Sequence, residues 1–350
     1  MERFRQISKT LLGTRTTLGA IMKNALVTGA RGFIGSVLCK MLLTNGYTVT
    51  AFVRDSNPWT KPRLEEHDLI KSFIVQGRLK IVHGDLTGDI SGICEGIDVV
   101  YNLAARTFVD HSIRHAEPFV RSNVLGTVNI LEEARRQKVP AYFQISTDEV
   151  YGQILEGYHD ETSPVCPRNP YAASKAGADA FVISYAHTYN MWTCVTRTEN
   201  NYGPFQHPQK VFPNFVGKAL QDKNLPVYGD GKHIRQWLHV CDHAQALIDL
   251  YEKGFLTKKI DAGEVFHIAG KQEITNTELA QRILTELNKP LHKIVYIDDH
   301  DIRPGHDKRY ALTCDKIKNA VGWTPSVSLN EGFKETVLWY KNNPEWTYRS

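Results

Sequence analysis

Tyr171 and Lys175 have the residue types and the spacing of a proton-transfer pair. They bound the run Tyr171-Ala-Ala-Ser-Lys175, which opens a segment of helical character, and a spacing of four residues puts both side chains on one face of a helix. A nearby ammonium group lowers the pKa of a phenol from about 10, so tyrosine becomes a usable base near neutral pH. Tyr228 and Lys232 share this spacing, but the Gly-Asp-Gly between them predicts a turn.

Asp148 and Glu149 form an acidic pair at the end of an apolar run, residues 141–146, that predicts a strand. Two neighbouring carboxylates in different environments can divide into a general acid and a general base. The hydroxyl of Thr147 is suited to hydrogen-bond a substrate oxygen beside Tyr171. The competing interpretation of the acids is a helix cap or a solvated turn.

A glycine-rich loop follows the first predicted strand and opens a predicted helix. Glycines at positions 29, 32 and 35 give the spacing GxxGxxG. Glycine permits the tight turn and a close backbone approach to a pyrophosphate, and the helix N-terminus offers free N–H groups to the phosphates. The sequence therefore predicts a dinucleotide site. The residues predicted to contact the cofactor are Gly29, Gly32, Phe33, Ile34, Gly35, Arg54, Asp55, Asp85, Leu86, Leu103, Ala104, Ala105, Tyr171 and Lys175.

The end of the second predicted strand bears on the choice between NAD and NADP. An acid there commonly binds the ribose hydroxyls of NAD, whereas this chain has Val53 followed by Arg54 and Asp55. Arg54 suits the 2′-phosphate of NADP, and Asp55 suits the ribose of NAD after a small shift. We expect NAD, and NADP stays open as the alternative.

Strands that alternate with helices must position these side chains. The predicted strands are residues 24–28, 48–53, 79–82, 97–103, 141–146 and 193–197, and the predicted helices are residues 33–45, 118–138, 171–190, 237–255 and 275–288. This alternation predicts an α/β fold with a doubly wound parallel Rossmann sheet, with ligands outside the carboxyl ends of the strands.

The second half is less regular and predicts a smaller C-terminal α/β substrate domain. We expect an NAD(P)-binding domain over residues 22–198 plus about 234–270, and a substrate-binding domain over residues 199–233 and 271–350. Residues 339–350 read as a polar, aromatic tail. Residues 1–21 read as an extension from an upstream start, or alternatively as a transit peptide.

Composition excludes several classes of protein. The chain has 350 residues with 42 basic and 38 acidic side chains, a balance too even for a nucleic-acid-binding face. No apolar run has the length of roughly 20 residues that spans a bilayer, so we expect no membrane partner. The six cysteines are scattered without a CxxC pair, which favours a reducing, cytoplasmic location and no zinc site. We expect no metal elsewhere, although His239 and His243 lie four residues apart.

Together these motifs resemble the extended short-chain dehydrogenase/reductase superfamily, and the STDEVYG of residues 146–152 resembles the dTDP-glucose 4,6-dehydratase family in particular. The resemblance extends through most of the chain after Met22. Residues 108–113, 199–204, 208–211, 226–229, 234–238 and 303–307 are similar to the family's HVDRSI, SNNYGP, PEKL, PIYG, IRDWL and RPGHD.

The resemblance implies a dehydratase reaction on a nucleotide-diphospho-glucose. Tyr171, with Thr147 and Lys175, removes the proton of the sugar 4-OH while C4 gives up hydride. Glu149 then takes the C5 proton, Asp148 protonates the departing 6-OH, and hydride returns to C6 to leave a 4-keto-6-deoxy sugar. It also implies a homodimer through residues 118–138 and 171–190. The implied substrate-binding residues are Thr107, Asn200, Lys210, Tyr228, Arg235, Arg303 and His306.

Several positions depart from the family pattern and keep other functions open. Arg106 stands where an acid is common, Phe108 where His is common, and Gln209 where Glu is common; His267 stands where members carry Asn beside the nucleotide. We therefore expect dTDP-glucose as substrate, with UDP-glucose as the alternative. An epimerase or decarboxylase is the same-class rival, against which the acidic pair argues. A non-catalytic dinucleotide-binding sensor is the rival of another class.

Overall fold

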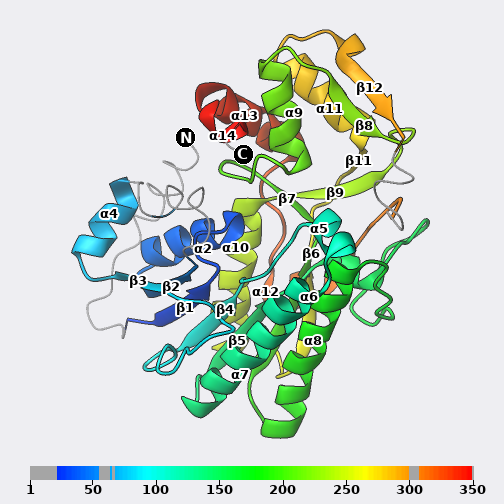
Figure 1. The fold of residues 1–350 in the computed structure, drawn as a ribbon. Coiled ribbons are helices and arrows are strands. Elements are labelled where there is room, and N and C mark those ends of the chain that lie inside the picture. Colours follow the sequence, from blue (N-terminus) through cyan, green and yellow to red (C-terminus); the bar gives the residue numbers. More distant parts are fainter. Residues whose placement is uncertain (1–21, 55–63, 65–67, 299–306, 349–350) are drawn as a thin grey trace.

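A parallel sheet of seven strands forms the centre of the molecule (Figure 1). The computed structural model describes residues 22–54, 64, 68–298 and 307–348, so the predictions for residues 1–21, Asp55, Arg303 and His306 lie outside the described residues. The strand order is β10-β6-β5-β4-β1-β2-β3. The strands are β1 (Asn24–Thr28), β2 (Thr48–Val53), β3 (Leu79–His83), β4 (Val99–Asn102), β5 (Ala141–Ile145), β6 (Thr193–Thr198) and β10 (Glu264–Ile268).

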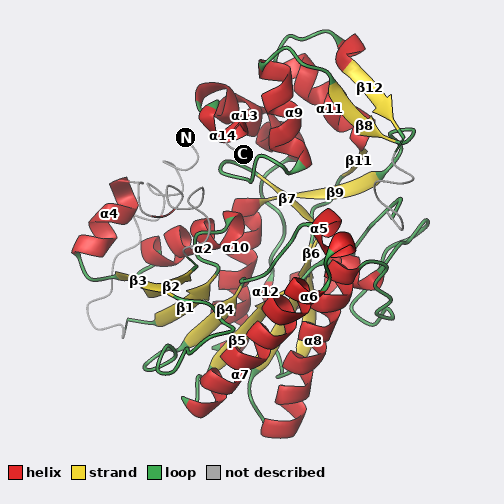
Figure 2. Cartoon of the chain, in the orientation of Figure 1, coloured by secondary structure: helices red, strands yellow, loops and turns green. Residues whose placement is uncertain are grey.

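Helices cover both faces of this sheet, as the red and yellow layers of Figure 2 show. Apolar side chains of one helix group pack with the strands in one large buried cluster, and those of the other group pack on the opposite face. The first group is α2 (Phe33–Thr44), α4 (Asp68–Val75), α10 (Val240–Asp249), the π-helical η4 (Leu250–Phe255) and α12 (Asp315–Val321). The second group includes α7 (Gly126–Arg136) and α8 (Pro170–Tyr189). The predicted doubly wound α/β fold is confirmed.

A second apolar core lies beside the sheet and gathers residues from the later half of the chain. Tyr202, Phe212, Trp237 and Phe333 are among its buried side chains, and their rings contact one another at centroid distances of 4.7–6.4 Å. Its elements are β7 (Asn200–Tyr202), α9 (Val211–Leu220), β8 (Leu225–Tyr228), β9 (Ile234–His239), β11 (Glu273–Thr275), α11 (Asn276–Glu286), the short η5 (Leu291–Lys293), β12 (Ile294–Ile297), α13 (Leu329–Asn342) and α14 (Glu345–Tyr348). This core and the carboxyl ends of the sheet strands face each other (Figure 1).

The prediction of one helix over residues 237–255 was wrong at its start. Trp237 and Leu238 belong to β9, and the helix α10 begins at Val240 after the side chain of His239 accepts a hydrogen bond from the backbone N–H of Cys241. Both apolar residues are buried, and a short buried apolar run does not distinguish a strand from a helix by its periodicity.

Two further predictions need correction. The described part of the predicted tail, residues 339–348, is packed against the second core, because Tyr340 is fully buried in α13 and Trp346 is buried in α14. Residues 118–138 are not one uniform helix, since α6 (Glu117–Phe119) and α7 flank a π-helical turn, η2 (Val120–Leu125). The seventh strand β10 was not predicted. No helix among the described residues combines the length and the apolar character needed to cross a lipid bilayer.

Candidate active site

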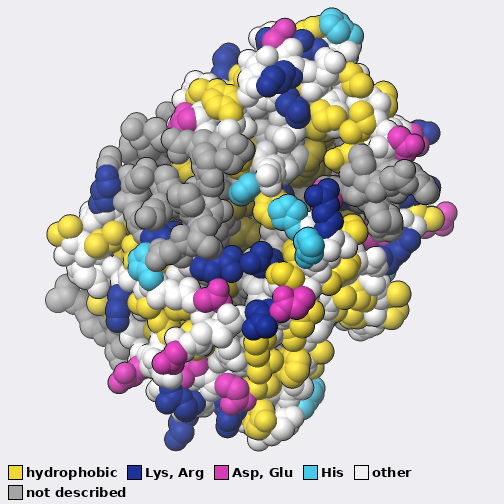
Figure 3. Space-filling view, in the orientation of Figure 1, with side chains coloured by type: hydrophobic (Ala, Val, Ile, Leu, Met, Phe, Trp, Pro, Cys, Tyr) yellow, Lys and Arg dark blue, Asp and Glu magenta, His cyan; other side chains and the backbone are white. Residues whose placement is uncertain are grey.

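A cavity of about 610 Å³ lies between the carboxyl ends of the sheet strands and the second core. Figure 3 shows Lys, Arg and His side chains around the hollow between these two parts of the molecule. The cavity brings together residues from the glycine loop, from the acidic pair and from the YAASK helix. Its lining residues are Gly29, Arg31, Gly32, Phe33, Ile34, Gly35, Phe52, Val53, Arg54, Gly84, Asp85, Leu86, Leu103, Ala104, Ala105, Arg106, Thr107, Phe108, His111, Phe119, Ser122, Ile145, Ser146, Thr147, Asp148, Glu149, Tyr171, Lys175, Thr198, Glu199, Asn200, Asn201, Gln206, His207 and Lys210.

The glycine loop, residues 29–35, exposes its main chain at the N-terminus of α2. We call this surface the glycine cradle. A Cβ added at Gly35 would lie 2.4 Å from the carbonyl oxygen of Gly29, and one at Gly32 would lie 2.9 Å from the same atom. Gly29 itself has a φ of +63° and approaches Ala104 so closely that a Cβ would stand 3.0 Å from its nitrogen. A helix N-terminus with exposed N–H groups binds phosphate groups, so this cradle fits the pyrophosphate of a dinucleotide.

Thr28 joins the ends of the two strands that flank the cradle. Its hydroxyl donates to Oδ1 of Asn102 over 2.6 Å and accepts from the backbone N–H groups of Leu103 and Ala104 over 3.1 Å each. β1 and β4 are adjacent in the sheet, and the strand order changes direction at this point. Ligands of open α/β sheets bind at such a crevice.

Arg54 and Asp85 close the edge of the cavity beyond β2. The Arg54 guanidinium lies 3.5 Å from Oδ2 of Asp85, and both side chains are exposed. Hydrogen bonds from the backbone and hydroxyl of Thr87 lower the pKa of the Asp85 carboxyl, and the charge of Arg54 lowers it further. Asp85 is therefore an anion at neutral pH, and Arg54 lies against it.

The acidic pair lies on a short 3₁₀ helix directly after β5, η3 (Asp148–Tyr151). Thr147 caps this helix, because its hydroxyl accepts from the backbone N–H of Glu149 and donates to Oδ1 of Asp148 over 3.0 Å. Burial, and then the charge of Glu149, raise the pKa of Asp148 to about 7. Asp148 can therefore hold a proton near neutral pH, as a general acid must.

Glu149 faces the same cavity and is held by Asn169. The Asn169 amide donates to Oε2 of Glu149 over 3.0 Å, while its Oδ1 accepts from the backbone N–H of Ala172 at the start of α8. Desolvation raises the pKa of the Glu149 carboxyl, and the Asn169 hydrogen bond and the positive charge of Arg235 lower it. One residue thus links the second acid to the helix that carries Tyr171.

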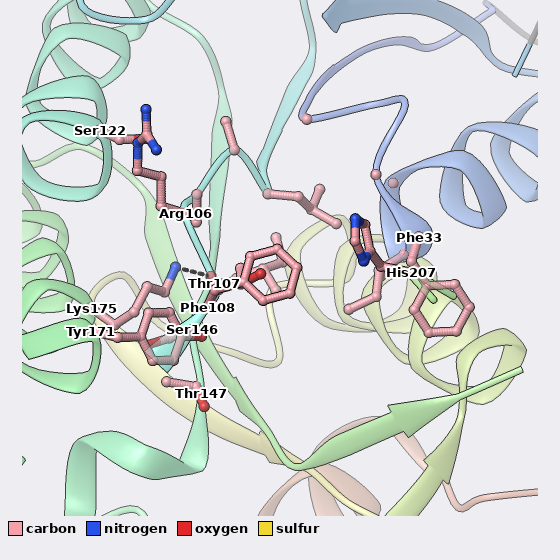
Figure 4. A pocket seen from close by; sticks show the side chains of 18 of the residues that line it. Phe33, Arg106, Thr107, Phe108, Ser122, Ser146, Thr147, Tyr171, Lys175 and His207 are labelled. Atoms are coloured by element: carbon pink, nitrogen blue, oxygen red, sulfur yellow. Dashed lines mark hydrogen bonds between the residues drawn. The ribbon is translucent and has the colours of Figure 1, made fainter. Parts of the chain in front are cut away.

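Tyr171 and Lys175 lie side by side at the start of α8, with Thr147 next to the tyrosine (Figure 4). Burial, and then the charge of Glu149, raise the pKa of the Tyr171 phenol, whereas a hydrogen bond with Thr147 lowers it. Burial lowers the pKa of Lys175 to about 8, and its Nζ donates to the carbonyl oxygen of Ile145 over 2.6 Å. The residues Thr147, Asp148, Glu149, Tyr171 and Lys175 therefore all line one cavity.

A buried polar network lies behind this group. Asp179 accepts from Arg197 over 3.1 Å and from the hydroxyl of Ser146 over 2.9 Å. Arg197 also donates to the hydroxyl of Tyr151 over 2.7 Å, and that hydroxyl lies 2.6 Å from Nε2 of His267. His267 stands where family members carry Asn beside the nucleotide. It is buried against Tyr151 of η3 and does not line the cavity.

The predicted substrate-binding residues are partly brought together. Thr107, Asn200 and Lys210 line the cavity, and Lys210 Nζ donates to the carbonyl oxygen of Thr107 over 3.1 Å. Arg235 is buried and does not line the cavity, but its charge lowers the pKa of both Asp148 and Glu149. Tyr228 lies in β8, away from the lining residues.

Asn123 supports the site and carried no signal in the sequence. It lies in η2, and its amide donates to Ser174 of α8 over 2.9 Å and to the carbonyl oxygen of Arg106 over 3.1 Å. Its Oδ1 accepts from the backbone N–H of Arg106 over 2.8 Å. Asn123 thus fixes the loop after β4 against the helix of Tyr171. A lone Asn in an apolar helical pattern gives no indication of such a role.

Other lining residues were also missed, among them Arg31, Ser122, Glu199, Gln206 and His207. They come from separate loops and follow no spacing that marks them. Within the described part of the chain, no group of three or more His, Cys, Asp or Glu side chains has the arrangement of a metal site.

Comparison with known proteins gives consistent matches over most of the chain. The family model described as GDP-mannose 4,6 dehydratase matches residues 26–336. A dTDP-glucose 4,6-dehydratase of Streptomyces niveus is 39% identical over 92% of this chain and 94% of its own length. The low-salt glycan biosynthesis protein Agl12 of Haloferax volcanii is 39% identical over 92% of this chain and its full length.

Solved structures show the same likeness. The dTDP-glucose 4,6-dehydratase DesIV of Streptomyces venezuelae, crystallised with NAD and TYD, has a TM-score of 0.84 and 38% identity, and the match covers 93% of this chain and 99% of that one. A UDP-glucuronic acid 4-epimerase of Bacillus cereus, in complex with UDP-glucuronic acid and NAD, has a TM-score of 0.83 but 28% identity, over 91% and 99% of the two chains.

Proposed function

The chain belongs to the GDP-mannose 4,6 dehydratase family, and we propose that it is an NAD-dependent 4,6-dehydratase of a nucleotide-diphospho-glucose, with dTDP-glucose as the substrate. It forms a 4-keto-6-deoxy sugar nucleotide. The name of the Streptomyces niveus relative and the TYD bound to DesIV support the thymidine nucleotide. UDP-glucose is the alternative that the experiment below distinguishes.

One observation carries the proposal: a phenol, an ammonium group and two carboxyl groups line a single cavity beside the glycine cradle. An epimerase needs a base at the 4-OH, whereas water elimination also needs a base at C5 and an acid at O6. Asp148 and Glu149 supply two such groups in different environments. Their presence favours dehydration over epimerisation.

The residues of the cradle fit a dinucleotide. Gly29, Gly32 and Gly35 leave no room for a Cβ, and we propose that they hold the pyrophosphate while Arg54 and Asp85 bound the adenosine end. When bound, NAD supplies the acceptor of the C4 hydride, the donor of the hydride to C6, and a positive charge that favours an ionised phenol. The NAD bound in the structure of DesIV supports NAD as the cofactor.

Tyr171 is the proposed base at the sugar 4-OH. Its oxygen takes the hydroxyl proton as C4 loses hydride and the C4–O bond becomes a carbonyl. Thr147 hydrogen-bonds the phenol, and the Lys175 ammonium lies on the same helix face. The Lys175–Ile145 hydrogen bond fixes the ammonium at the end of β5.

Glu149 and Asp148 carry out the elimination in this proposal. The 4-keto group acidifies the hydrogen on C5, and Glu149 takes it as a proton. Asp148 gives its proton to the C6 oxygen, which leaves as water. Glu149 exchanges its proton with solvent and returns a proton to C5 as C6 receives hydride. Tyr171 then releases its proton to solvent and Asp148 takes one up, which restores both groups for the next cycle.

The substrate diphosphate is proposed to lie near Lys210, Asn200 and Arg235. Lys210 and Arg235 are the cations whose charges act on Glu149, and cations bind phosphate oxygens by charge-assisted hydrogen bonds. Thr107, Tyr228, Arg303 and His306 remain proposed substrate contacts.

We propose a cofactor domain over residues 22–198 and about 234–270, and a substrate domain over residues 199–233 and 271–350. The second apolar core supports this division, whereas α12 packs on the first core.

We propose a homodimer through the face formed by η2, α7 and α8. Hydrophobic side chains gather over this part of the molecule in Figure 3. Val120, Leu125, Phe181 and Tyr189 of these helices are 54%, 42%, 43% and 47% exposed. Contiguous apolar surface of this kind marks protein interfaces, and a second copy offers the same apolar face in return.

We also propose a cytoplasmic location, since the six cysteines are free.

The test of the function is incubation of the purified protein with dTDP-, UDP-, CDP- and GDP-glucose, followed by mass spectrometry. The proposal predicts loss of one water from dTDP-glucose in preference to the others. Preferential dehydration of UDP-glucose would show that the substrate carries uridine in place of thymidine, and the proposed dehydratase reaction would stand. Isomerisation without loss of water would indicate an epimerase, and bound cofactor without turnover on any sugar nucleotide would indicate a sensor.

A further inference from the structure

Glu199 is a carboxyl of the active-site cavity, besides Asp148 and Glu149, to which the proposed reaction gives no role. It lies between β6 and β7 and lines the cavity with Asp148 and Glu149. The residue is 5% exposed. In the family motif SNNYGP, which residues 199–204 resemble, a serine stands at this position. The glutamate is therefore a feature of this chain that the family resemblance does not explain.

One oxygen of the Glu199 carboxyl is held and the other is not. Oε1 accepts a hydrogen bond from the backbone N–H of Gly270. Oε2 is buried and has no hydrogen-bond partner among the described residues. A buried polar atom without a partner costs free energy, and such atoms in native proteins need an explanation such as a ligand.

The surroundings of Glu199 favour its neutral form. Burial raises its pKa well above the usual value for glutamate, and the negative charges of Asp148 and Glu273 raise it further. The charged groups that act on it are both acids, and their charges favour the protonated carboxyl. A neutral carboxylic acid is both a donor and an acceptor of hydrogen bonds.

The backbone around Glu199 is rigid. The Thr198 hydroxyl donates to the carbonyl oxygen of Ile268 over 3.0 Å, and the Asn201 amide donates to the carbonyl oxygen of Glu199 over 3.0 Å. Gly270 packs so tightly that a Cβ there would lie 2.1 Å from the carbonyl oxygen of Trp237. The position of the free oxygen is therefore set by the fold.

We propose that Glu199 is a specificity-determining residue, whose carboxylic acid is anchored on Gly270 through one oxygen and hydrogen-bonds a hydroxyl of the bound hexose through the other. This inference rests on the proposed dehydratase function. Glu199 lines the cavity together with Asp148 and Glu149, the two acids that act on the hexose in the proposed reaction. The hydroxyls available are those at C2 and C3, because those at C4 and C6 react.

The test compares wild type with Glu199→Ser and Glu199→Gln, using dTDP-glucose and its 2-deoxy and 3-deoxy analogues. Serine is the residue of the family motif and removes the carboxyl. Glutamine is the matched control, because it retains the acceptor for Gly270 and presents an N–H donor in place of the O–H. A site built to hydrogen-bond a hydroxyl discriminates against the analogue that lacks it.

We expect wild type and E199Q to prefer dTDP-glucose over one of the two analogues by roughly tenfold in kcat/KM, the effect of one neutral hydrogen bond. In E199S this preference falls to near unity, because kcat/KM for dTDP-glucose drops to the value for that analogue. The melting temperature and the amount of bound NAD, measured on each variant, report the fold and the cofactor site separately.

Equal preferences in wild type and E199S would overturn the proposal. So would an equal loss on all three substrates together with weaker NAD retention, since the free oxygen would then face the cofactor. Absence of dehydration by wild type would instead refute the proposed function, which the first arm of the experiment detects on its own.

Discussion

Asn169 donates a 3.0 Å hydrogen bond to Glu149 and at the same time caps α8, the helix that carries Tyr171. The base proposed for C5 and the base proposed for the 4-OH are thereby fixed by the two ends of one amide side chain.

Replacement of Asn169 separates these two roles. Serine is an equally good N-cap but is too short to reach Glu149, so we expect Asn169→Ser to lower kcat by about 10- to 100-fold, the effect of a lost hydrogen bond to a charged group, with little change in melting temperature. Asn169→Ala loses the cap as well, and its free energy of unfolding falls by about 1 kcal/mol. Steady-state kinetics and thermal unfolding of both variants check this. An N169S enzyme with wild-type kcat would show that the amide does not orient Glu149.

The acid Asp148 gives the reaction a pH dependence. Its pKa is raised to about 7 by burial and by Glu149, so the protonated form that donates to O6 is lost above that pH. We expect kcat to decline above about pH 7 in wild type. Asp148→Asn lowers kcat by about 10²- to 10⁴-fold and removes this decline. If kcat of D148N still declined above about pH 7, the decline would belong to another titratable group.

The same carboxyl links stability to pH. Its pKa is raised in the folded state from 3.8 to about 7, so it contributes stability that is fully present below pH 3.8 and is lost as pH rises through about 7. Asp148→Asn has no such group. Its free energy of unfolding relative to wild type should therefore rise across this window, by on the order of 4 kcal/mol. Denaturant titrations of both proteins at intervals from pH 4 to pH 8 measure this difference in the free energy of unfolding. A difference that stays constant over this range would contradict the raised pKa of Asp148.

The cradle requires glycine at position 35. Alanine there would put a Cβ 2.4 Å from the Gly29 carbonyl oxygen, and the strain of about 1–3 kcal/mol should weaken NAD binding by about 5- to 150-fold. Gly177→Ala is the matched control, because its Cβ would meet Val124 at an ordinary 3.5 Å. Calorimetric titration of NAD checks both. Equal affinities of G35A and wild type would place the pyrophosphate elsewhere.

The apolar face of η2, α7 and α8 predicts the oligomeric state. Phe181→Glu puts a charge on a side chain that is 43% exposed, so it should leave the fold intact and shift the protein from dimer to monomer. Sedimentation velocity measures the change, with circular dichroism as the check on folding. A wild-type protein that sediments as a monomer at micromolar concentration would contradict the proposed dimer.

The sequence predicts those parts of the site that short-range geometry dictates. A GxxGxxG turn, a four-residue spacing on a helix and an acidic pair after a strand each act within one element, so Gly35, Tyr171, Lys175, Asp148 and Glu149 could be placed without the fold. The six predicted strands, each of which overlaps a strand of the central sheet, follow from the same local patterns.

Other features depend on contacts between distant segments and could not be predicted. Asn123 and Glu199 matter because of partners 51 and 71 residues away. His267 is buried against Tyr151, 116 residues away. Trp346 is buried because a second core, built from α9, α13 and α14, receives it.

The central claim is that C4 oxidation and water loss take place on one hexose in this cavity. The most direct measurement is the fate of deuterium in dTDP-[4-²H]glucose, followed by mass spectrometry and NMR of the product. The account predicts a 4-keto product lighter by one water, with the deuterium at C6 and a solvent-derived hydrogen at C5. Deuterium that stays on C4, or that is lost to solvent from a product of unchanged composition, would contradict it.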